Sequence, residues 1–330
     1  MSEKYVVRLK NAAIYHADNP FGSTSAEKLM RRGEMVLSDV NLCVAPGEFV
    51  YLIGRVGSGK STLFKLLTGL EGEYEGCISV NGTDIRQLWP ALYDRIGVVL
   101  QDAFLFDDTL LQNITLYRPE LRERVEPVLH SLGMDAFLAS HDLEQTFQNT
   151  KGNLSGGERQ LMLLGRALIQ NAHTLIMDEP TVAVDPQSRN KILEGIQTLN
   201  RQGSTIIYTS HYMEEVEQIC TRIAIMDHGR VIAQGTKEEL KQMIKTGETI
   251  TVEAIALEEK NLQDIRTLDH VFDVQYEKQV LIVRCTDAKH NLIRLLNYLQ
   301  SQDISFGRVF SELPTLNDVF LEITGKQLRD

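Results

Sequence analysis

Residues 54 to 61 have the types and spacing of a loop that binds phosphate groups. They read Gly-Arg-Val-Gly-Ser-Gly-Lys-Ser and match the pattern G-x-x-x-x-G-K-[ST]. The three glycines let backbone N–H groups surround phosphate oxygens without a Cβ in the way. The lysine supplies a positive charge for the β- and γ-phosphates, and the last serine a hydroxyl for Mg²⁺. We therefore expect a nucleoside triphosphate to be bound by Gly54, Arg55, Val56, Gly57, Ser58, Gly59, Lys60, Ser61 and Thr62.

A second stretch is suited to an anion at the start of a helix. Ser155 is a natural N-cap for the apolar-rich segment that follows it. Gly156 and Gly157, just inside that cap, expose backbone donors. The sequence therefore predicts two helix starts, at Lys60 and after Ser155, that favour negative charge.

Other polar residues follow apolar runs that are typical of buried strands. The run 174–177 ends in Asp178 and Glu179, Gln101 follows the run 96–100, and His211 comes shortly after the run 205–209. Strands that alternate with helices predict a mostly parallel sheet, at whose carboxyl edge ligand-binding groups gather. We expect these residues to lie at the same edge as the phosphate loop, which follows the strand Phe49 to Ile53 and precedes a helix from Lys60.

The remaining patterns indicate two domains. Near the N-terminus, strands are expected at 5–9 and 35–44, and Asn81-Gly82 favours a hairpin after the strand 77–80. Residues 109–145 are mostly helical, and a first domain is expected at 1–245, with a helical subdomain at about 102–165. Residues 246–330 follow the order β-α-β-β-α-β of a ferredoxin-like α+β unit, then a helix. This second domain has no phosphate loop and is interpreted as regulatory or docking.

Composition limits the compartment and the partners. The formal net charge of −11 argues against general nucleic-acid binding. No run reaches the roughly 18 apolar residues of a membrane span, and the N-terminus does not resemble a signal peptide. The four cysteines form no C-x-x-C pair, which is typical of a reducing compartment. The chain is expected to be cytoplasmic.

The motifs, taken in order, resemble those of the ATP-binding-cassette (ABC) ATPase family. They are GRVGSGKST, the glutamine of VVLQD, LSGGERQ, MDEP, VAVD at 182–185 and His211. The segment LNDVFLEITGK at 316–326 resembles the C-terminal domain of ATP-binding subunits of ABC-2 type exporters of the drug-resistance class. The resemblance implies an α/β nucleotide-binding domain with a mainly parallel sheet, an antiparallel β portion and a helical subdomain, followed by the small α+β domain.

The same resemblance implies roles for single residues. Tyr15 would stack on the adenine of ATP, although the adjacent His16 and simple packing of Tyr15 remain alternatives. Ser61, Gln101 and Asp178 would hold Mg²⁺, and Gln101 would also sense the γ-phosphate. Glu179 would orient and deprotonate the attacking water, with His211 contacting the γ-phosphate. Catalysis would thus rest on Lys60, Gln101, Glu179 and His211.

The resemblance also implies partners. One phosphate loop and one LSGG motif cannot complete a site, so Ser155, Gly156 and Gly157 would close over the ATP of a second nucleotide-binding domain, a second copy or a paralogue. ATP hydrolysis would drive a separate membrane permease, which would hold the chain at the cytosolic face of the membrane. Its contact surface is expected at 101–108 and the helical stretch to about Gln145, where Phe104, Leu105 and Phe106 either insert into the partner or pack within the cassette.

Three departures leave the subclass open. Glu158 replaces the commoner glutamine of LSGGQ, and Val182 stands where a small polar residue is usual. Arg55-Val56 resembles the cell-division type of ABC ATPase, whereas QDAFLFDDTLLQNI is exporter-like. Export is the first interpretation, and a non-transport ATPase that drives a membrane partner in cell division or envelope remodelling is the second. A soluble protein acting on ribosomes or DNA is the third, although it normally needs two cassettes or a long coiled coil.

Overall fold

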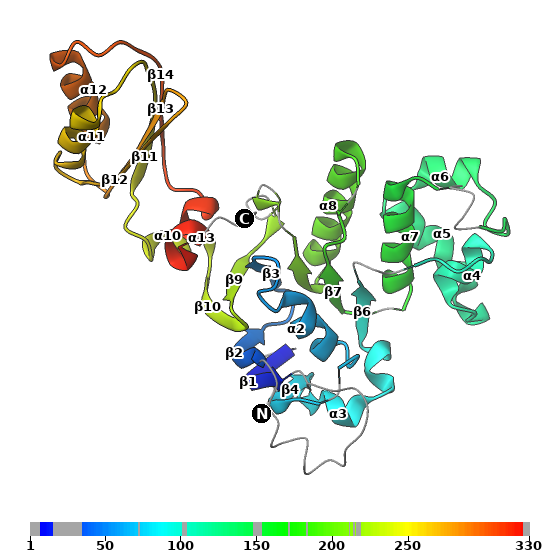
Figure 1. Ribbon diagram of the computed structural model, residues 1–330. Helices are drawn as coiled ribbons and strands as arrows, with labels where there is room; N and C mark the ends of the chain where they lie inside the picture. The colour runs from blue at the N-terminus through cyan, green and yellow to red at the C-terminus, as the bar shows by residue number, and fades with distance from the viewer. Residues whose placement is uncertain are drawn as a thin grey trace, which may run out of the picture. The chain divides into compact units, whose positions relative to one another are not determined.

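The chain folds into two compact units, which divide between Gln234 and Gly235 (Figure 1). The computed structural model describes residues 7–15, 35–71, 73–100, 104–147, 154–170, 172–182, 184–210, 212–213, 215 and 219–325. The expected division at 245/246 lies further along the chain. Helix α10 (Lys237–Gln242) falls in the second unit, where it packs against α13 (Leu316–Thr324) and buries Leu240.

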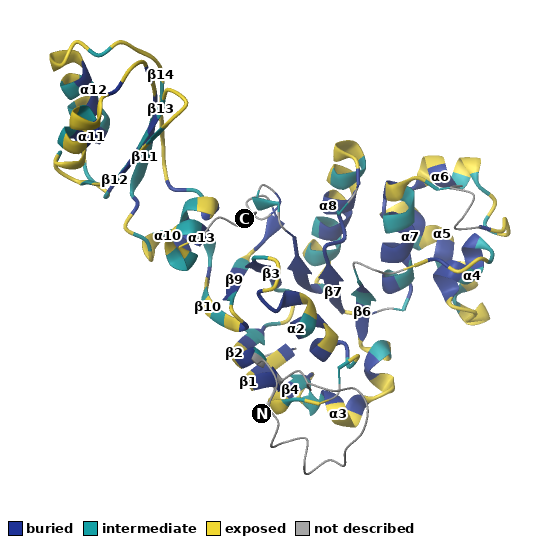
Figure 2. Cartoon of the chain, in the orientation of Figure 1, coloured by how far each residue is buried: buried dark blue, intermediate teal, exposed yellow. Residues whose placement is uncertain are grey.

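A six-stranded sheet forms the centre of the first unit (Figure 1). Its strand order is β10-β9-β3-β8-β7-β6. β3 (Phe49–Gly54) pairs in parallel with β8 (Thr205–Thr209) and β9 (Arg222–Asp227). β7 (Thr174–Asp178) pairs in parallel with β8 and with β6 (Ile96–Val99), and β10 (Arg230–Gly235) lies at the edge. β3, β7 and β8 are buried at every position, which explains their unbroken apolar runs (Figure 2). The expected mostly parallel sheet is confirmed.

Three helices connect these strands. α2 (Lys60–Leu67) follows β3, α7 (Gly156–Leu168) precedes β7, and α8 (Pro186–Arg201) joins β7 to β8. α2 buries Leu63, Phe64, Leu66 and Leu67 in the core. Asp185 caps α8 by accepting bonds from two backbone N–H groups of its first turn.

A second sheet of the first unit is antiparallel, in the order β2-β1-β4-β5. It contains β1 (Val7–Tyr15), β2 (Met35–Val44), β4 (Glu75–Val80) and β5 (Thr83–Asp84), followed by α3 (Ile85–Leu88) and η1 (Ala91–Asp94). β1 extends beyond the expected end at residue 9. Asn11 has a positive φ of 51°, and the register shifts beside it, so the strand passes through an irregularity rather than ending.

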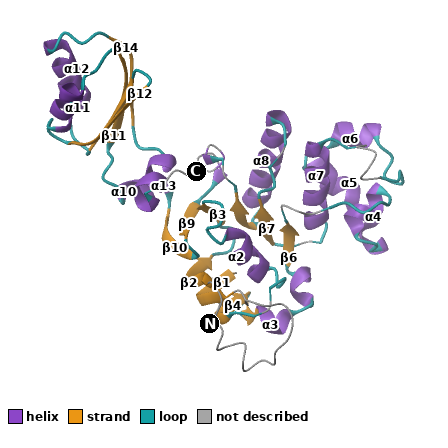
Figure 3. Ribbon diagram, viewed as in Figure 1, coloured by secondary structure: helices purple, strands orange, loops and turns teal. Residues whose placement is uncertain are grey.

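Short helices form the helical portion (Figure 3). They are α4 (Leu110–Thr115), η2 (Pro119–Leu121), α5 (Arg122–Ser131) and α6 (Asp135–Ser140). α7 packs against α4 and α5. Arg166 on α7 holds α4 and the loop before it by donating to the carbonyl oxygens of Asn113 (2.7 Å) and Phe104 (2.9 Å). Within the described ranges, no helix is long and apolar enough to cross a bilayer.

The second unit has the expected β-α-β-β-α-β order. Its sheet runs β12-β13-β11-β14 and is antiparallel throughout. The elements are β11 (Glu248–Ala254), α11 (Glu259–Arg266), β12 (Val271–Glu277), β13 (Val280–Cys285), α12 (Asn291–Ser301) and β14 (Phe306–Glu312). Both α11 and α12 cover one face of the sheet (Figure 3), over a core that includes Ile250, Val252, Leu281 and Val283.

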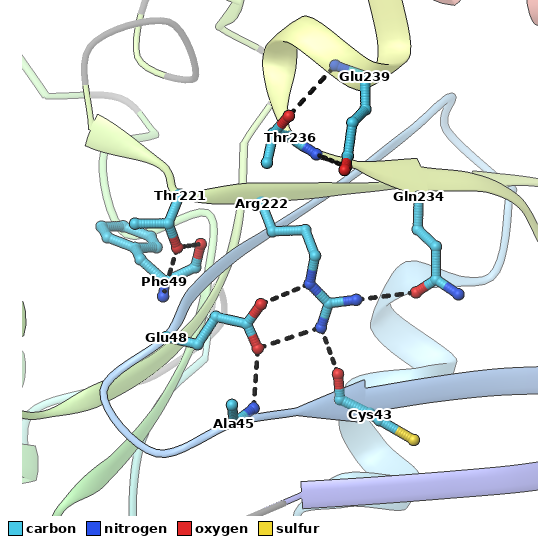
Figure 4. Close-up of polar contacts among 9 residues, drawn as sticks. All are labelled: Cys43, Ala45, Glu48, Phe49, Thr221, Arg222, Gln234, Thr236 and Glu239. Atoms are coloured by element: carbon cyan, nitrogen blue, oxygen red, sulfur yellow. Dashed lines mark hydrogen bonds and ion pairs between the residues drawn. The ribbon is translucent and has the colours of Figure 1, made fainter. Parts of the chain in front are cut away.

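Arg222 fastens the start of β9 to the turn before β3 (Figure 4). Its guanidinium pairs with the Glu48 carboxylate at 2.5 Å and also donates to the Cys43 carbonyl and to Gln234 Oε1. Both side chains of the ion pair are only 20% exposed. In the register of β3 with β9, Arg222 pairs with Val50 near the start of β3, whereas Met226 pairs with Gly54 at its end. This network therefore lies at the end of the strands opposite to the phosphate loop.

We predict that Arg222→Ala lowers the free energy of unfolding by about 2 kcal/mol, because the half-buried Glu48 carboxylate loses its counter-charge. Denaturant unfolding followed by circular dichroism measures this change. Arg122→Ala is the matched control, since Arg122 and Glu144 form an ion pair at 2.6 Å but are 63% and 51% exposed. Its cost is expected to stay below about 1 kcal/mol. Equal losses in the two variants would contradict the prediction.

Candidate phosphate-binding site

The phosphate loop lies between the end of β3 and the start of α2, as expected. Two of its glycines could not carry a side chain in this fold. A Cβ on Gly54 would lie 2.5 Å from the Met226 carbonyl oxygen, and one on Gly59 would lie 2.7 Å from a methyl group of Leu37. Gly59 also has a φ of 100° at the N-cap of α2. The loop therefore presents backbone at the helix start, where unpaired N–H groups favour an anion.

Lys60 is buried beneath this loop, with 6% of its surface exposed. Its ammonium donates to the carbonyl oxygens of Gly54 (2.5 Å) and Arg55 (3.0 Å). Burial lowers the pKa of the ammonium, and the carboxylates of Glu179 and Asp178 partly offset that lowering. The positive charge is therefore fixed at the inner side of the loop and faces two acids.

A cavity of about 310 Å³ opens between the loop and Glu179. Its wall consists of Val36, Arg55, Val56, Gly57, Gly59, Lys60, Ser61, Thr62 and Glu179. The structure thus brings together residues that are more than a hundred positions apart in the sequence. Val56, which is 90% exposed, lies at the outer rim of the loop, whereas Ser58 is buried below it.

Asp178 and Glu179 are buried where β7 ends, and Thr209 at the end of β8 holds both of them. The Thr209 hydroxyl donates to Asp178 Oδ1 at 2.6 Å, and the Glu179 backbone N–H donates to the Thr209 hydroxyl and carbonyl oxygens at 3.0 and 3.2 Å. Sequence reasoning did not single out Thr209. The only signal for it is its register with Asp178 across two adjacent strands.

Glu179 is a buried residue, with 6% of its surface exposed. Burial raises the pKa of this carboxyl, the neighbouring Asp178 charge raises it further, and Lys60 opposes the rise. Glu179 therefore holds a proton more readily than an ordinary surface carboxylate does. A group of this kind, in the wall of a cavity lined by a phosphate loop, can orient a water molecule and accept its proton.

Ser155 caps α7 as expected, through a reciprocal capping box with Glu158. The Ser155 hydroxyl accepts from the Glu158 backbone N–H, and the Glu158 carboxylate accepts from the Ser155 N–H at 2.8 Å. Ser155 and Gly156 are exposed, whereas Gly157 is buried against Ser188 and Val184. Within the described chain, these three residues contribute nothing to the wall of the Lys60 cavity.

Four residues expected at the site cannot be placed by their side chains. Gln101 and His211 lie outside the described residues, and so does His16. Tyr15 ends β1 opposite Met35, and its side chain is outside the described part of the chain. Their roles stay predictions from the sequence.

Comparisons with known proteins agree with these features. Residues 37–182 match the family model described as ABC transporter. Residues 235–324 match the model of the C-terminal domain of ATP-binding proteins like DrrA1-3.

Relatives match nearly the whole chain. The linearmycin resistance ATP-binding protein LnrL of Bacillus subtilis is 35% identical over 89% of this chain and 95% of its own length. The daunorubicin resistance ATP-binding protein DrrA3 of Streptomyces coeruleorubidus is 33% identical over 95% and 98%, respectively. The Nod factor export ATP-binding protein I of Rhizobium sp. (strain N33) is 31% identical over 89% and 94%.

Solved structures share the fold. A bacterial Atm1-family ABC exporter with ATP bound aligns with a TM-score of 0.61 and 27% identity over 74% of this chain, which spans 40% of that longer chain. An ATP-binding subunit of an ABC transporter aligns with a TM-score of 0.58 and 24% identity over 72% of this chain and 92% of that one, which bears on the fold alone. Family model, relatives and fold agree, and the chain belongs to the ABC transporter family as an ATP-binding subunit of the ABC ATPase type.

Proposed function

We propose that this chain hydrolyses ATP at the Lys60 loop and so powers export through a separate membrane permease. The observation that carries the proposal is the cavity whose wall joins the phosphate loop to Glu179. The relatives are named for drug resistance and for Nod factor export, which favours export over the cell-division interpretation. The permease would hold the chain at the cytosolic face of the membrane.

The phosphates of ATP would lie in the cradle formed by the loop backbone and the start of α2. Lys60 would stabilise charge on the β- and γ-phosphates, because its buried ammonium cannot be screened by water. The protein has little covalent work to do in phosphoryl transfer, so positioning and charge dominate catalysis. We assign Glu179 the role of orienting the attacking water and accepting its proton, which its raised pKa supports.

The residues present suit Mg²⁺. Ser61 is exposed and lines the cavity, and the buried Asp178 ends β7, which only β8 separates from β3. Hydroxyl and carboxylate oxygens are the donors that this cation prefers, together with phosphate oxygens. When bound, Mg²⁺ would neutralise charge on the β- and γ-phosphates. Gln101 is proposed as a further ligand from the sequence alone.

A second nucleotide-binding domain would complete each site. Ser155 and Gly156 are exposed and are absent from the wall of the described Lys60 cavity, so their surface is accessible to another chain. We propose that they close over the ATP of a second copy or a paralogue, with hydrolysis reopening the interface. The C-terminal unit, whose sequence lacks a phosphate loop, would regulate or dock.

The loop before α4 is the proposed contact with the permease. Leu105 is fully buried, which favours packing within the cassette for this residue. Phe104 and Phe106 are 60% and 37% exposed and contact each other edge to face at 5.2 Å. Arg166 fixes the Phe104 backbone by a hydrogen bond. The aromatic pair would therefore form an exposed, ordered apolar surface to which a membrane subunit binds.

Glu179→Gln is expected to bind ATP with a dissociation constant within about 2-fold of the wild-type value, while hydrolysis falls at least ~100-fold, since the amide cannot accept the proton of water. Binding of a fluorescent ATP analogue and release of phosphate measure the two effects. Glu144→Gln, which alters an exposed carboxylate far from the loop in the sequence, should hydrolyse normally. Turnover near the wild-type rate in Glu179→Gln would refute the assignment.

Lys60→Ala is expected to weaken ATP binding ~10- to 100-fold, because the phosphates lose a buried counter-charge. The matched control is Lys65→Ala, which removes an exposed lysine from the last turn of the same helix. Titration with the fluorescent analogue measures both variants, and melting curves confirm that they are folded. An unchanged affinity of Lys60→Ala for the ATP analogue would contradict the proposed role of this residue.

The double variant Phe104→Ser and Phe106→Ser is expected to lose co-purification with the membrane subunit encoded beside this chain and to keep its affinity for ATP. Leu70→Ser, at another exposed apolar position of the same unit, should co-purify normally. Undiminished recovery of the membrane subunit with the double variant would show that the aromatic pair is not the contact.

A further inference from the structure

A buried carboxylate outside the cavity connects the segments that follow β7 and β8. Glu215 is 3% exposed, and both of its carboxylate oxygens accept hydrogen bonds from buried hydroxyls. Thr181 Oγ1 donates to Oε1 at 2.9 Å, and the Tyr208 hydroxyl donates to Oε2 at 3.0 Å. Thr181 lies two residues after Glu179, and Tyr208 lies on β8 beside Thr209.

A cation from a third segment balances the charge of this carboxylate. Arg189 on α8 approaches Glu215 Oε1 with its Nε at 3.7 Å, and its guanidinium stacks on the Tyr212 ring at 3.9 Å. A buried ionic network of this kind gains little net stability over an apolar cluster of the same volume. What it does supply is a fixed geometry, because each polar group accepts only one arrangement of its partners.

That geometry matters because the Glu179 backbone adopts the left-handed conformation, with a φ of 50°. A non-glycine residue holds this conformation only when its surroundings determine it. Thr209 holds the N–H of Glu179, and the Val182 N–H donates to the Glu179 carbonyl oxygen at 3.1 Å. Thr181 lies inside this turn, and its side chain is bound to Glu215.

We propose that Glu215 is a positioning residue for ATP hydrolysis. By binding Thr181 it holds the turn 179–182, and with it the Glu179 carboxylate, in the wall of the Lys60 cavity. Glu215 is absent from the described wall of that cavity, so it acts through Thr181 rather than on ATP. This inference rests on the proposed hydrolytic role of Glu179.

Thr181→Val tests the contact with the smallest change, since valine keeps the shape of threonine and removes its donor. Thr181→Val and Glu215→Gln are each expected to lower kcat ~10- to 100-fold, because a small displacement of a catalytic group has effects of this size. KM for ATP and binding of the fluorescent analogue should stay within about 2-fold, since ground-state binding is untouched. Arg222→Ala, at the opposite edge of the sheet, is the control, and its folded protein should keep the wild-type kcat.

The decisive measurement uses the Glu179→Gln background in the full-length chain. If Glu215 acts only by placing Glu179, then Glu179→Gln with Thr181→Val should hydrolyse ATP within about 2-fold of Glu179→Gln alone. A further loss by the full factor of the single variant would overturn the inference. So would an unchanged kcat in both single variants, or an equal loss of kcat in Arg222→Ala at a comparable fall in melting temperature. A near-wild-type rate for Glu179→Gln alone would refute the proposed function itself.

Discussion

The buried ammonium of Lys60 is the constraint on which the site depends. A cation with 6% exposure has lost most of its hydration, and two loop carbonyls with two nearby acids take the place of water. Gly54 and Arg55 can turn their carbonyl oxygens inward only if the loop curls tightly around the lysine. The curled loop leads directly into the start of α2, where unpaired N–H groups favour an anion. The burial of Lys60 thus fixes both the position of the positive charge and the shape of the phosphate loop.

The parallel sheet explains why the acids lie where Lys60 needs them. β3 and β7 are separated by β8 alone, so the loop and the Asp178–Glu179 pair emerge at the same edge. Thr209, at the end of the strand between them, holds Asp178 by its side chain and Glu179 by its backbone. Burial lowers the pKa of Lys60 and raises the pKa of Glu179. Because the two groups are close, each charge partly offsets the pKa shift of the other.

Local patterns were enough to predict the elements and the residues of the loop. The glycine spacing, the apolar runs of β3, β7 and β8, and the Ser155 cap all act over a few residues, and the structure has each of them. Thr209 and Glu215 escaped prediction, because their roles depend on which strands are neighbours. The end of β1 was placed too early, because the register shift at Asn11 allows the strand to continue. The packing of α10 on α13 likewise joins segments more than seventy residues apart.

The burial of Gly157 has a consequence for how the LSGG motif should be dissected. A Cβ at this position would lie 2.6 Å from the Ser188 Cβ, which cannot rotate away, so the glycine lets α7 pack against α8 within one chain. A methyl group at residue 157 would disturb the packing of α7 against α8 within its own chain, whether or not a second chain binds. Gly156, in contrast, is exposed. Packing within the chain therefore constrains residue 157, whereas residue 156 would be constrained by the proposed contact with a second nucleotide-binding domain.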